Sequence, residues 1–133
     1  MALFHLQIVT PDRMVFDGQA EKIILRTVGG DVCILARHID YAAALDIGEA
    51  HVTFEDGSTR FAACSGGLLS VHQGQVKVIA TTFEWADEID AVRAALAQKK
   101  AEERLKELKR DDEDYALAEA RLKRALIRQR VKG

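Results

Sequence analysis

The sequence predicts an all-β sandwich in residues 1–86 followed by an α-helical hairpin, two antiparallel helices, in residues 87–133. Two observations carry this prediction. The one proline and eight of the nine glycines lie in the first segment, whereas the second has only Gly133 at its end. Apolar residues alternate with polar ones in the first segment, as in half-buried strands, and recur three and four positions apart in the second, as on one face of a helix.

The first segment contains several short stretches with strand character. Phe4, Leu6 and Ile8 alternate with polar residues, and the following Thr10-Pro11-Asp12-Arg13 has the composition of a turn. Further strands are expected at 14–16, 20–28, 32–35, 50–54, 59–64, 68–71 and 76–83, of which 32–35 is expected to be fully buried. Residues 36–45 lack clean alternation and are expected to form a loop with up to one helical turn. About eight short strands joined by turns indicate a sandwich or a flattened barrel.

Cysteines and histidines are scattered through the first segment. Cys33 and Cys64 lie in apolar runs, far apart and without metal-ligand spacing, so both are expected to be small core residues without a disulfide. The four histidines stand one to a strand or loop, without the pairing of a helical zinc site. Those expected to face solvent or to lie in turns are His5, His51 and His72. No metal site is therefore predicted.

The sequence also lacks a catalytic constellation. Ser65 stands before two glycines, which favours a tight bend over a nucleophile. Gly29-Gly30 and Gly66-Gly67 are followed by strands, whereas a phosphate loop needs a helix directly after it. No apolar run is long enough to span a membrane, and the N-terminus lacks the pattern of a secretory signal. The residues alone indicate a non-enzymatic binding or regulatory protein that stays in the cytoplasm.

The second segment shows two helical stripes joined by a polar turn. The first stripe consists of Ala94, Ala97, Ala101, Leu105 and Leu108, and the second of Tyr115, Ala118, Leu122 and Leu126. The acids at 111–114 suit the N-cap and first turn of a second helix. Because alanine lets two helices approach closely, an antiparallel hairpin is expected. The turn has neither Gly nor Pro, so one long helix is the alternative.

The two segments also differ in net charge. Residues 1–86 carry 6 Lys/Arg and 10 Asp/Glu, a net charge of −4, whereas residues 87–133 carry 13 and 11, a net charge of +2. From Tyr115 onward there are six bases and a single acid, Glu119. A basic helix is suited to an acidic protein surface, an anionic lipid or a phosphate ligand. The acidic first segment makes nucleic acid the weakest candidate partner.

Short motifs run along the whole chain: Ile8-Val9-Thr10-Pro11-Asp12, Val15-Phe16-Asp17-Gly18, Gly30-Asp31-Val32-Cys33-Ile34-Leu35, His38, Ser65-Gly66-Gly67-Leu68 and Ile89-Asp90-Ala91-Val92-Arg93-Ala94. In their order, together with the chain length and the helical tail, these motifs resemble the epsilon subunit of the F-type, proton-translocating ATP synthase. The resemblance implies an N-terminal β-sandwich and a C-terminal helical hairpin, which agrees with the patterns above. It also implies a place in the rotating central stalk.

The resemblance implies partners as well. These are the gamma subunit, the ring of c subunits and the catalytic alpha/beta hexamer, with no nucleic acid and no required cofactor. The location implied is the cytoplasmic face of the bacterial cell membrane, with peripheral attachment through the complex. Asp31 and His38 are implied to contact the c ring, and Arg121 is one of the cations implied to meet an acidic surface of the hexamer.

The loop around His38 departs from the family. The family has Pro-Gly before this histidine and a second proline two residues after it, whereas Ala36-Arg37-His38-Ile39-Asp40 keeps only the histidine. The loss of both prolines and the glycine removes the rigidity that presents the loop. The alternative to contact with the c ring is therefore that His38 is an ordinary loop residue.

Some bacterial members of this family bind ATP on the folded hairpin, and the sequence is similar to them. The positions implied to bind the nucleotide are Glu84, Ile89, Asp90, Arg93, Ala94, Arg124 and Arg128. Two guanidiniums one helical turn apart can hold phosphates, and carboxylates can accept from the adenine amino group or the ribose. Lys100 stands where such members often have arginine. The alternatives are that Asp90 is only an N-cap and that the arginines are only a solvated face.

The function expected from these arguments is that of a regulatory and coupling subunit without a catalytic residue. It links gamma to the c ring, and its C-terminal helices inhibit ATP hydrolysis, with ATP on the hairpin as a regulatory ligand. The alternative is a free-standing β-sandwich and helical hairpin that senses a nucleotide.

Overall fold

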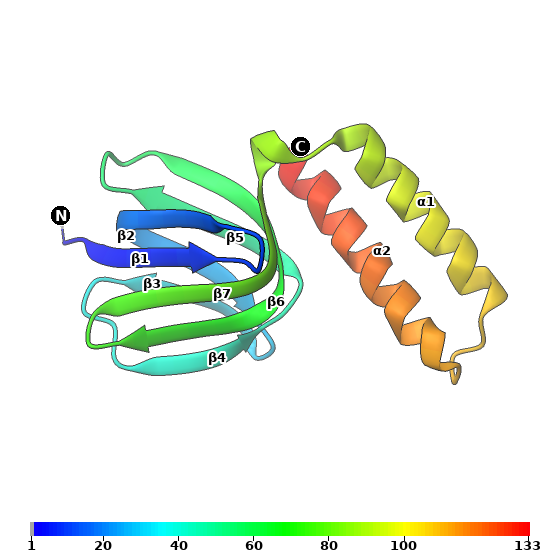
Figure 1. The fold of residues 1–133 in the computed structure, drawn as a ribbon, viewed down its shortest axis with the longest axis horizontal. Coiled ribbons are helices and arrows are strands. Elements are labelled where there is room, and N and C mark those ends of the chain that lie inside the picture. The colour runs from blue at the N-terminus through cyan, green and yellow to red at the C-terminus, as the bar shows by residue number, and fades with distance from the viewer. Residues whose placement is uncertain (1) are drawn as a thin grey trace.

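A computed structural model describes residues 2–133, which form seven β-strands, a short 3-10 helix and two α-helices (Figure 1). The strands are β1 (Phe4–Val9), β2 (Met14–Thr27), β3 (Gly30–Leu35), β4 (Tyr41–Leu45), β5 (Gly48–Phe54), β6 (Thr59–His72) and β7 (Gln75–Trp85). The helices are η1 (Ala86–Glu88), α1 (Ala91–Glu107) and α2 (Glu113–Lys132). The β-sandwich followed by two antiparallel helices confirms the predicted fold class.

Two long strands, β2 and β6, hold the sandwich together because each pairs with different neighbours along its length. The first half of β2 pairs with β1, and the second half pairs with β3 and β5. Residues 59–64 of β6 pair with β5, and residues 67–71 pair with β4. On its other side, β6 pairs through residues 62–72 with the whole of β7. The parallel pairing of β1 with β7 completes the circuit. The strands β1, β2, β5, β6 and β7 therefore form a closed circuit, as in a flattened barrel, whereas β3 pairs within residues 2–133 with β2 alone and lies at an edge.

The bend of β6 depends on Gly66 and Gly67. Their φ angles are +65° and +114°, in the region that L side chains rarely adopt. A Cβ on Gly67 would lie 1.9 Å from the carbonyl oxygen of Ile79 on β7. The predicted bend at Ser65-Gly66-Gly67 is therefore confirmed, and it lies inside one strand rather than between two.

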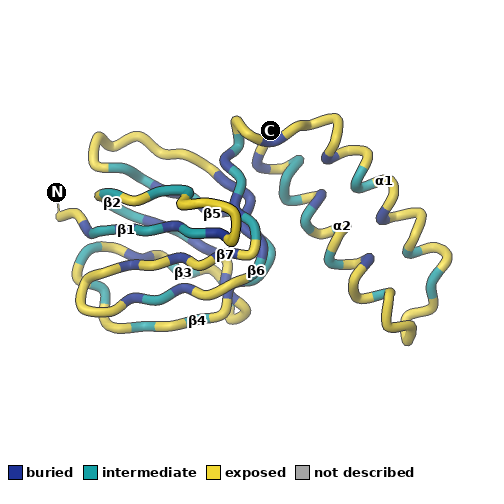
Figure 2. Tube along the Cα trace, viewed as in Figure 1, coloured by how far each residue is buried: buried dark blue, intermediate teal, exposed yellow. Residues whose placement is uncertain are grey.

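The sandwich core follows the alternation that the sequence shows (Figure 2). Its largest fully buried side chains are Leu6, Ile8, Ile23, Leu25, Ile34, Leu69, Val52 and Val78. Trp85, at the end of β7, packs edge-to-face on Phe83 with ring centroids 5.1 Å apart and belongs to this core. Cys64 is buried, and burial raises the pKa of its thiol to about 12.

Two predictions for the segment between β2 and β5 are wrong. Residues 41–45, expected in a loop, form β4, whose Tyr41-Ala42-Ala43-Ala44-Leu45 conceals the alternation because alanine occurs on both faces. Residues 32–35 belong to β3 but are not fully buried. Cys33 is exposed and Leu35 is 52% exposed, because only one face of β3, carrying Ile34, packs on the core.

The hairpin is a pair of separate helices rather than one long helix. Asp90 caps α1 by accepting a hydrogen bond from the backbone N–H of Arg93 (3.1 Å), and Asp112 caps α2 by accepting from that of Asp114 (3.1 Å). Leu108 has an extended backbone and ends α1. The acids at 111–114 thus begin the second helix as predicted: the carboxylate of Asp112 accepts a free N–H group of the first turn, and Glu113 and Asp114 place negative charge in that turn.

The facing surfaces of the two helices are lined with alanine. The buried residues are Ala94 and Ala101 on α1 and Ala118, Ala125 and Val131 on α2. The predicted second stripe is wrong at Leu126, which is 44% exposed. At about 100° per residue, position 125 lies about 20° from Ala118 around the helix and position 126 about 80° away, so the stripe continues through Ala125.

The hairpin meets the sandwich through α2, which lies between the sandwich and α1 in Figure 1. The apolar contact is small: Ala63, Ile89 and Val131 are buried together, with Ala86 and Ile127 packed against them. Across residues 2–133, neither α1 nor α2 has the combination of length and apolar composition that a membrane-spanning helix needs.

Candidate functional site

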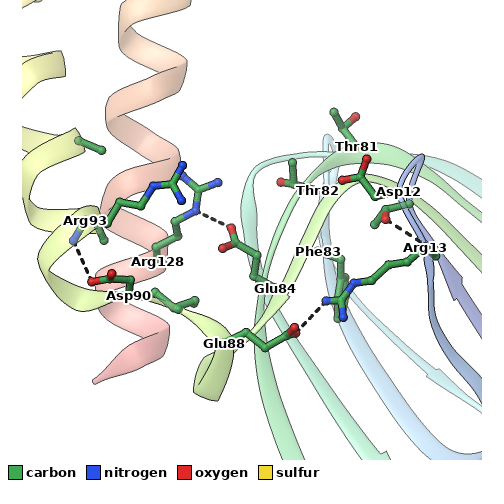
Figure 3. A pocket seen from close by; sticks show the side chains of 14 residues that line it. Asp12, Arg13, Thr81, Thr82, Phe83, Glu84, Glu88, Asp90, Arg93 and Arg128 are labelled. Atoms are coloured by element: carbon green, nitrogen blue, oxygen red, sulfur yellow. Dashed lines mark hydrogen bonds and ion pairs between the residues drawn. The ribbon is translucent and has the colours of Figure 1, made fainter.

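A polar cleft of about 480 Å³ lies where the hairpin meets the sandwich. Its walls are the β1–β2 turn, the end of β7, the η1 linker with the entry to α1, and one side chain of α2. In Figure 3, Arg93 and Arg128 lie on the hairpin side, Asp12, Arg13, Thr81 and Thr82 lie on the sandwich side, and Glu84 lies between them. A molecule in this cleft would contact both parts of the protein.

Six of the seven side chains predicted to bind a nucleotide line this cleft. They are Glu84, Ile89, Asp90, Arg93, Ala94 and Arg128. The fold brings them together because β7 runs directly into η1 and α1, while α2 returns antiparallel to α1 (Figure 1). Arg128 of α2 thereby lies opposite Glu84 of β7 (Figure 3). Arg124 lies outside the cleft, in a groove beside it.

Arg128 and Glu84 form the main charged contact across the cleft. The Nε of Arg128 donates to Oε1 of Glu84 at 2.6 Å, with 28% and 34% of the two side chains exposed. An anionic ligand at Arg128 therefore competes with Glu84 or shares the guanidinium with it. Because a guanidinium has five N–H donors, sharing is chemically possible.

Asp90 is an N-cap, as one of the two sequence interpretations proposed. Its Oδ1 accepts from the backbone N–H of Arg93, which satisfies one donor of the first turn of α1. A carboxylate has about four acceptor positions, so capping leaves capacity to accept from a ligand in the cleft. The two interpretations of Asp90 are compatible.

A basic groove of about 670 Å³ between α1 and α2 adjoins the cleft and shares Ala97 and Arg128 with it. Its cationic side chains are Lys100, Arg104, Arg121, Arg124 and Arg128. Partial burial, followed by the neighbouring charges of Arg128 and Arg121, lowers the pKa of Arg124. Within residues 2–133 the Arg124 side chain has no hydrogen-bond or ion-pair partner. An anion in the groove would relieve this repulsion.

The motifs of the hairpin did not predict the sandwich wall of the cleft. Thr10, Asp12 and Arg13 come from the β1–β2 turn. The Nη2 of Arg13 donates to Oε1 of Glu88 at 2.9 Å, and this contact is the main reason why the pKa of Glu88 is lowered. The turn and the η1 linker lie 75 positions apart in the sequence, so no local pattern could have linked them.

The side chains predicted to contact partners lie away from the cleft. Asp31 is exposed on β3, with Oδ1 3.3 Å from Nη1 of Arg26, and Arg121 is exposed on α2. His38 is half-buried, donates from Nδ1 to the carbonyl of Ile39 (2.8 Å) and packs its ring near that of Tyr41.

Asp40 restrains the loop that contains His38. Its Oδ1 accepts from the backbone N–H of Gln73 (2.9 Å), and its Oδ2 lies 3.3 Å from Nδ1 of His72. Arg37 adopts a φ of +67° at the position where the family has glycine. Side-chain contacts thus supply part of the restraint that the family's prolines would give.

The remaining histidines lie on strands. His72 is exposed, and His5 and His51 are half-buried. Hydrogen bonds to Gln75 and then to Asp17 raise the pKa of His5, because both partners accept from the protonated ring. Within residues 2–133, no three His, Cys, Asp or Glu side chains come close enough together to hold a metal ion.

The fold and the cleft define a two-part class of protein, in which a β-sandwich carries a basic helical hairpin over a shared polar cleft. Residues 3–86 match the family described as "ATP synthase, Delta/Epsilon chain, beta-sandwich domain". Residues 87–133 match "ATP synthase, Delta/Epsilon chain, long alpha-helix domain". The chain belongs to the ATP synthase delta/epsilon chain family.

Relatives and solved structures agree with this assignment. The chain is 42% identical over 133 residues to the ATP synthase epsilon chain of Bacillus velezensis, covering 100% of this chain and 99% of the relative. It is 36% identical over 132 residues to that of an Exiguobacterium species, covering 99% and 97%. A chain in the cryo-EM structure of the Euglena gracilis mitochondrial ATP synthase, which contains OSCP, F1 and the c-ring, is similar with a TM-score of 0.79 at 26% identity, covering 92% of this chain and 77% of that one. The resemblance to the epsilon subunit is confirmed.

Proposed function

We propose that the protein is the regulatory and coupling subunit of the ATP synthase central stalk and links the gamma subunit to the ring of c subunits. Family membership supports this function, as does the Euglena gracilis structure, in which a similar chain occurs with F1 and the c-ring. The subunit has no catalytic step of its own and acts on the alpha/beta hexamer by binding. These findings favour it over a free-standing nucleotide sensor.

The C-terminal helices act as a brake on ATP hydrolysis. From Tyr115 onward α2 carries six bases and one acid, which suits it to an acidic surface of the hexamer. To reach that surface, α2 leaves the sandwich, and the small apolar contact at Ala63, Ile89 and Val131 keeps the cost of leaving low. The folded and released forms then differ by a few kcal/mol, which is within the range of one bound ligand.

ATP is the ligand that favours the folded form. The basic groove with Lys100, Arg124 and Arg128 suits a triphosphate, and the cleft with Glu84 and Asp90 suits the amino group and hydroxyls of a nucleoside. The observation that carries this proposal is that the cleft and the groove meet at Arg128. One ligand can therefore contact α1, α2 and β7 together, and only the folded form offers all three.

The brake is tested by deleting residues 112–133 from the subunit in the assembled enzyme. We expect ATP hydrolysis at low ATP to rise severalfold without loss of assembly, because α2 is the part that reaches the hexamer. Reversing the charges of Arg121, Arg124 and Arg128 to Glu should have much the same effect while keeping the full length. Equal rates for the intact and deleted complexes would show that the tail is not a brake.

A further inference from the structure

Three cations of α2 each meet a carboxylate of the sandwich. The contacts are Arg128 Nε to Glu84 Oε1 at 2.6 Å, Lys123 Nζ to Asp46 Oδ2 at 3.6 Å, and Arg130 Nε to Glu49 Oε2 at 3.5 Å. The carboxylates come from β7, from the connection between β4 and β5, and from β5. A single helix is thus held by acids that the fold gathers from separate parts of the sandwich.

These ion pairs lie on both sides of the apolar contact between α2 and the sandwich. At about 100° per residue around α2, Lys123 and Arg130 fall on one side of Ile127 and Val131, and Arg128 falls on the other. The apolar contact itself buries only Ala63, Ile89 and Val131. Charge therefore has a larger share in the docking of α2 than it has in the sandwich core.

We infer that Asp46, Glu49 and Glu84 form an internal latch, which occupies the cations of α2 in the folded form and thereby sets how readily the tail is released. The latch itself is a property of this chain, and its effect on ATP hydrolysis rests on the proposed function. Each cation pairs either with its sandwich carboxylate or with an acidic partner surface. Release then exchanges one acid for another, so the two forms stay close in free energy and the tail moves reversibly.

The strength of the latch follows from the exposure of its pairs. A partly exposed ion pair changes an equilibrium by about 1.5- to 5-fold, so the pairs of Asp46 and Glu49 together account for roughly 2- to 25-fold. Such pairs weaken as salt screens them, with a Debye length of about 10 Å at 0.1 M. Both partners of the pairs at Asp46 and Glu49 lie outside the nucleotide cleft, so these two pairs can be changed without touching it.

The test uses the full-length protein, with two fluorophores for single-molecule energy transfer. Cys33 is exposed and accepts one dye, Cys64 is buried with a raised pKa and stays unlabelled, and Glu119→Cys on the exposed side of α2 accepts the other. We expect the docked fraction to fall between 10 mM and 500 mM NaCl. Asp46→Lys with Glu49→Lys should shift the docking equilibrium toward release by at least the 2- to 25-fold estimated for loss of the two pairs.

Two matched variants separate the latch from a general effect of charge. Glu21→Lys with Glu55→Lys makes the same charge change at sandwich acids that have no ion pair to α2 within residues 2–133, and should leave docking within about 1.5-fold of the parent protein. Adding Lys123→Glu and Arg130→Glu to the latch variant again places opposite charges face to face, with the acid now on α2 and the base on the sandwich. This charge swap should restore docking. A latch variant that docks like its control, or a swap that does not restore docking, would overturn the latch.

The assembled enzyme then distinguishes the latch from the brake. If both hold, Asp46→Lys with Glu49→Lys lowers ATP hydrolysis at low ATP, because more tails are released to inhibit. If the double substitution shifts the energy transfer but leaves the rate of hydrolysis unchanged, the latch is supported and the proposed brake is contradicted.

Discussion

Arg124 and Arg128 are one helical turn apart but have different surroundings. Arg128 pairs with Glu84 at 2.6 Å, whereas Arg124 is partly buried beside Arg128 and Arg121, and its pKa is lowered by that burial and those charges. A phosphate near both would screen the repulsion at Arg124 and compete for the pair at Arg128. Arg124, which has no partner within residues 2–133, therefore gains more from a ligand than Arg128 does.

Substitution of either arginine tests the nucleotide site. Arg124→Ala and Arg128→Ala should each weaken ATP binding by about 1–3 kcal/mol, since each removes a charge-assisted hydrogen bond. Arg110→Ala, in the exposed turn between the helices, removes the same charge outside the groove and should leave affinity nearly unchanged. Isothermal calorimetry measures the ATP affinity of all three variants. A wild-type protein that shows no binding at millimolar ATP would contradict the proposed nucleotide site.

At the scale of elements, β6 decides the shape of the sandwich. It pairs with β5 before its bend and with β4 after it, so the two layers share this strand. The bend brings the backbone of Gly67 against that of Ile79, leaving no room for a side chain. Positive φ alone would favour glycine, and the close approach makes it necessary.

Two glycines with positive φ distinguish the effect of backbone strain from the effect of the close contact with β7. Gly67→Ala should lower the free energy of unfolding by more than about 2 kcal/mol, because backbone strain is joined by a clash with β7. Gly57→Ala, at φ +84° with no atom of residues 2–133 within 4 Å of an added Cβ, should show only the strain, about 1 kcal/mol. Urea denaturation measures both free energies of unfolding. Equal losses of stability at the two positions would show that the backbone at Ile79 moves aside at little cost.

At the scale of the whole molecule, the chain consists of an acidic sandwich with its own core and a basic hairpin that rests on it. The buried core cluster of the sandwich is drawn entirely from residues between Phe4 and Trp85. Among residues 2–133, Ala63 is the one sandwich residue buried in the small cluster that also contains Ile89 and Val131. The sandwich core therefore depends little on the tail.

A fragment of residues 1–86 should fold by itself and unfold cooperatively. Losing the small contact with the hairpin, worth about 1 kcal/mol, should lower its Tm by roughly 4–8 °C relative to the full chain. Thermal unfolding followed by near-UV circular dichroism, which detects the packing of Trp85, measures this. A fragment without near-UV signal or without a sharp transition would mean that the hairpin completes the sandwich core.

Patterns among neighbouring residues were enough to predict the local features of the structure. Alternation placed Phe4, Leu6 and Ile8 in the core, and the acids at 111–114 marked the start of the second helix, because side-chain periodicity and capping act over only a few residues. Alternation failed at β4, where alanine occupies both faces, and at Cys33, since an apolar run does not show whether a second layer covers it.

Contacts between residues far apart in the sequence could not be predicted in this way and depend on how the elements pack. Six of the seven predicted nucleotide-binding residues line the cleft, yet its opposite wall comes from the β1–β2 turn through Arg13 and Glu88, a pair separated by 75 positions. The contacts of Lys123 with Asp46 and of Arg130 with Glu49 likewise arise from the docking of α2. The physical reason is that charges meet across space wherever packing places the elements, and no period in the sequence encodes that meeting.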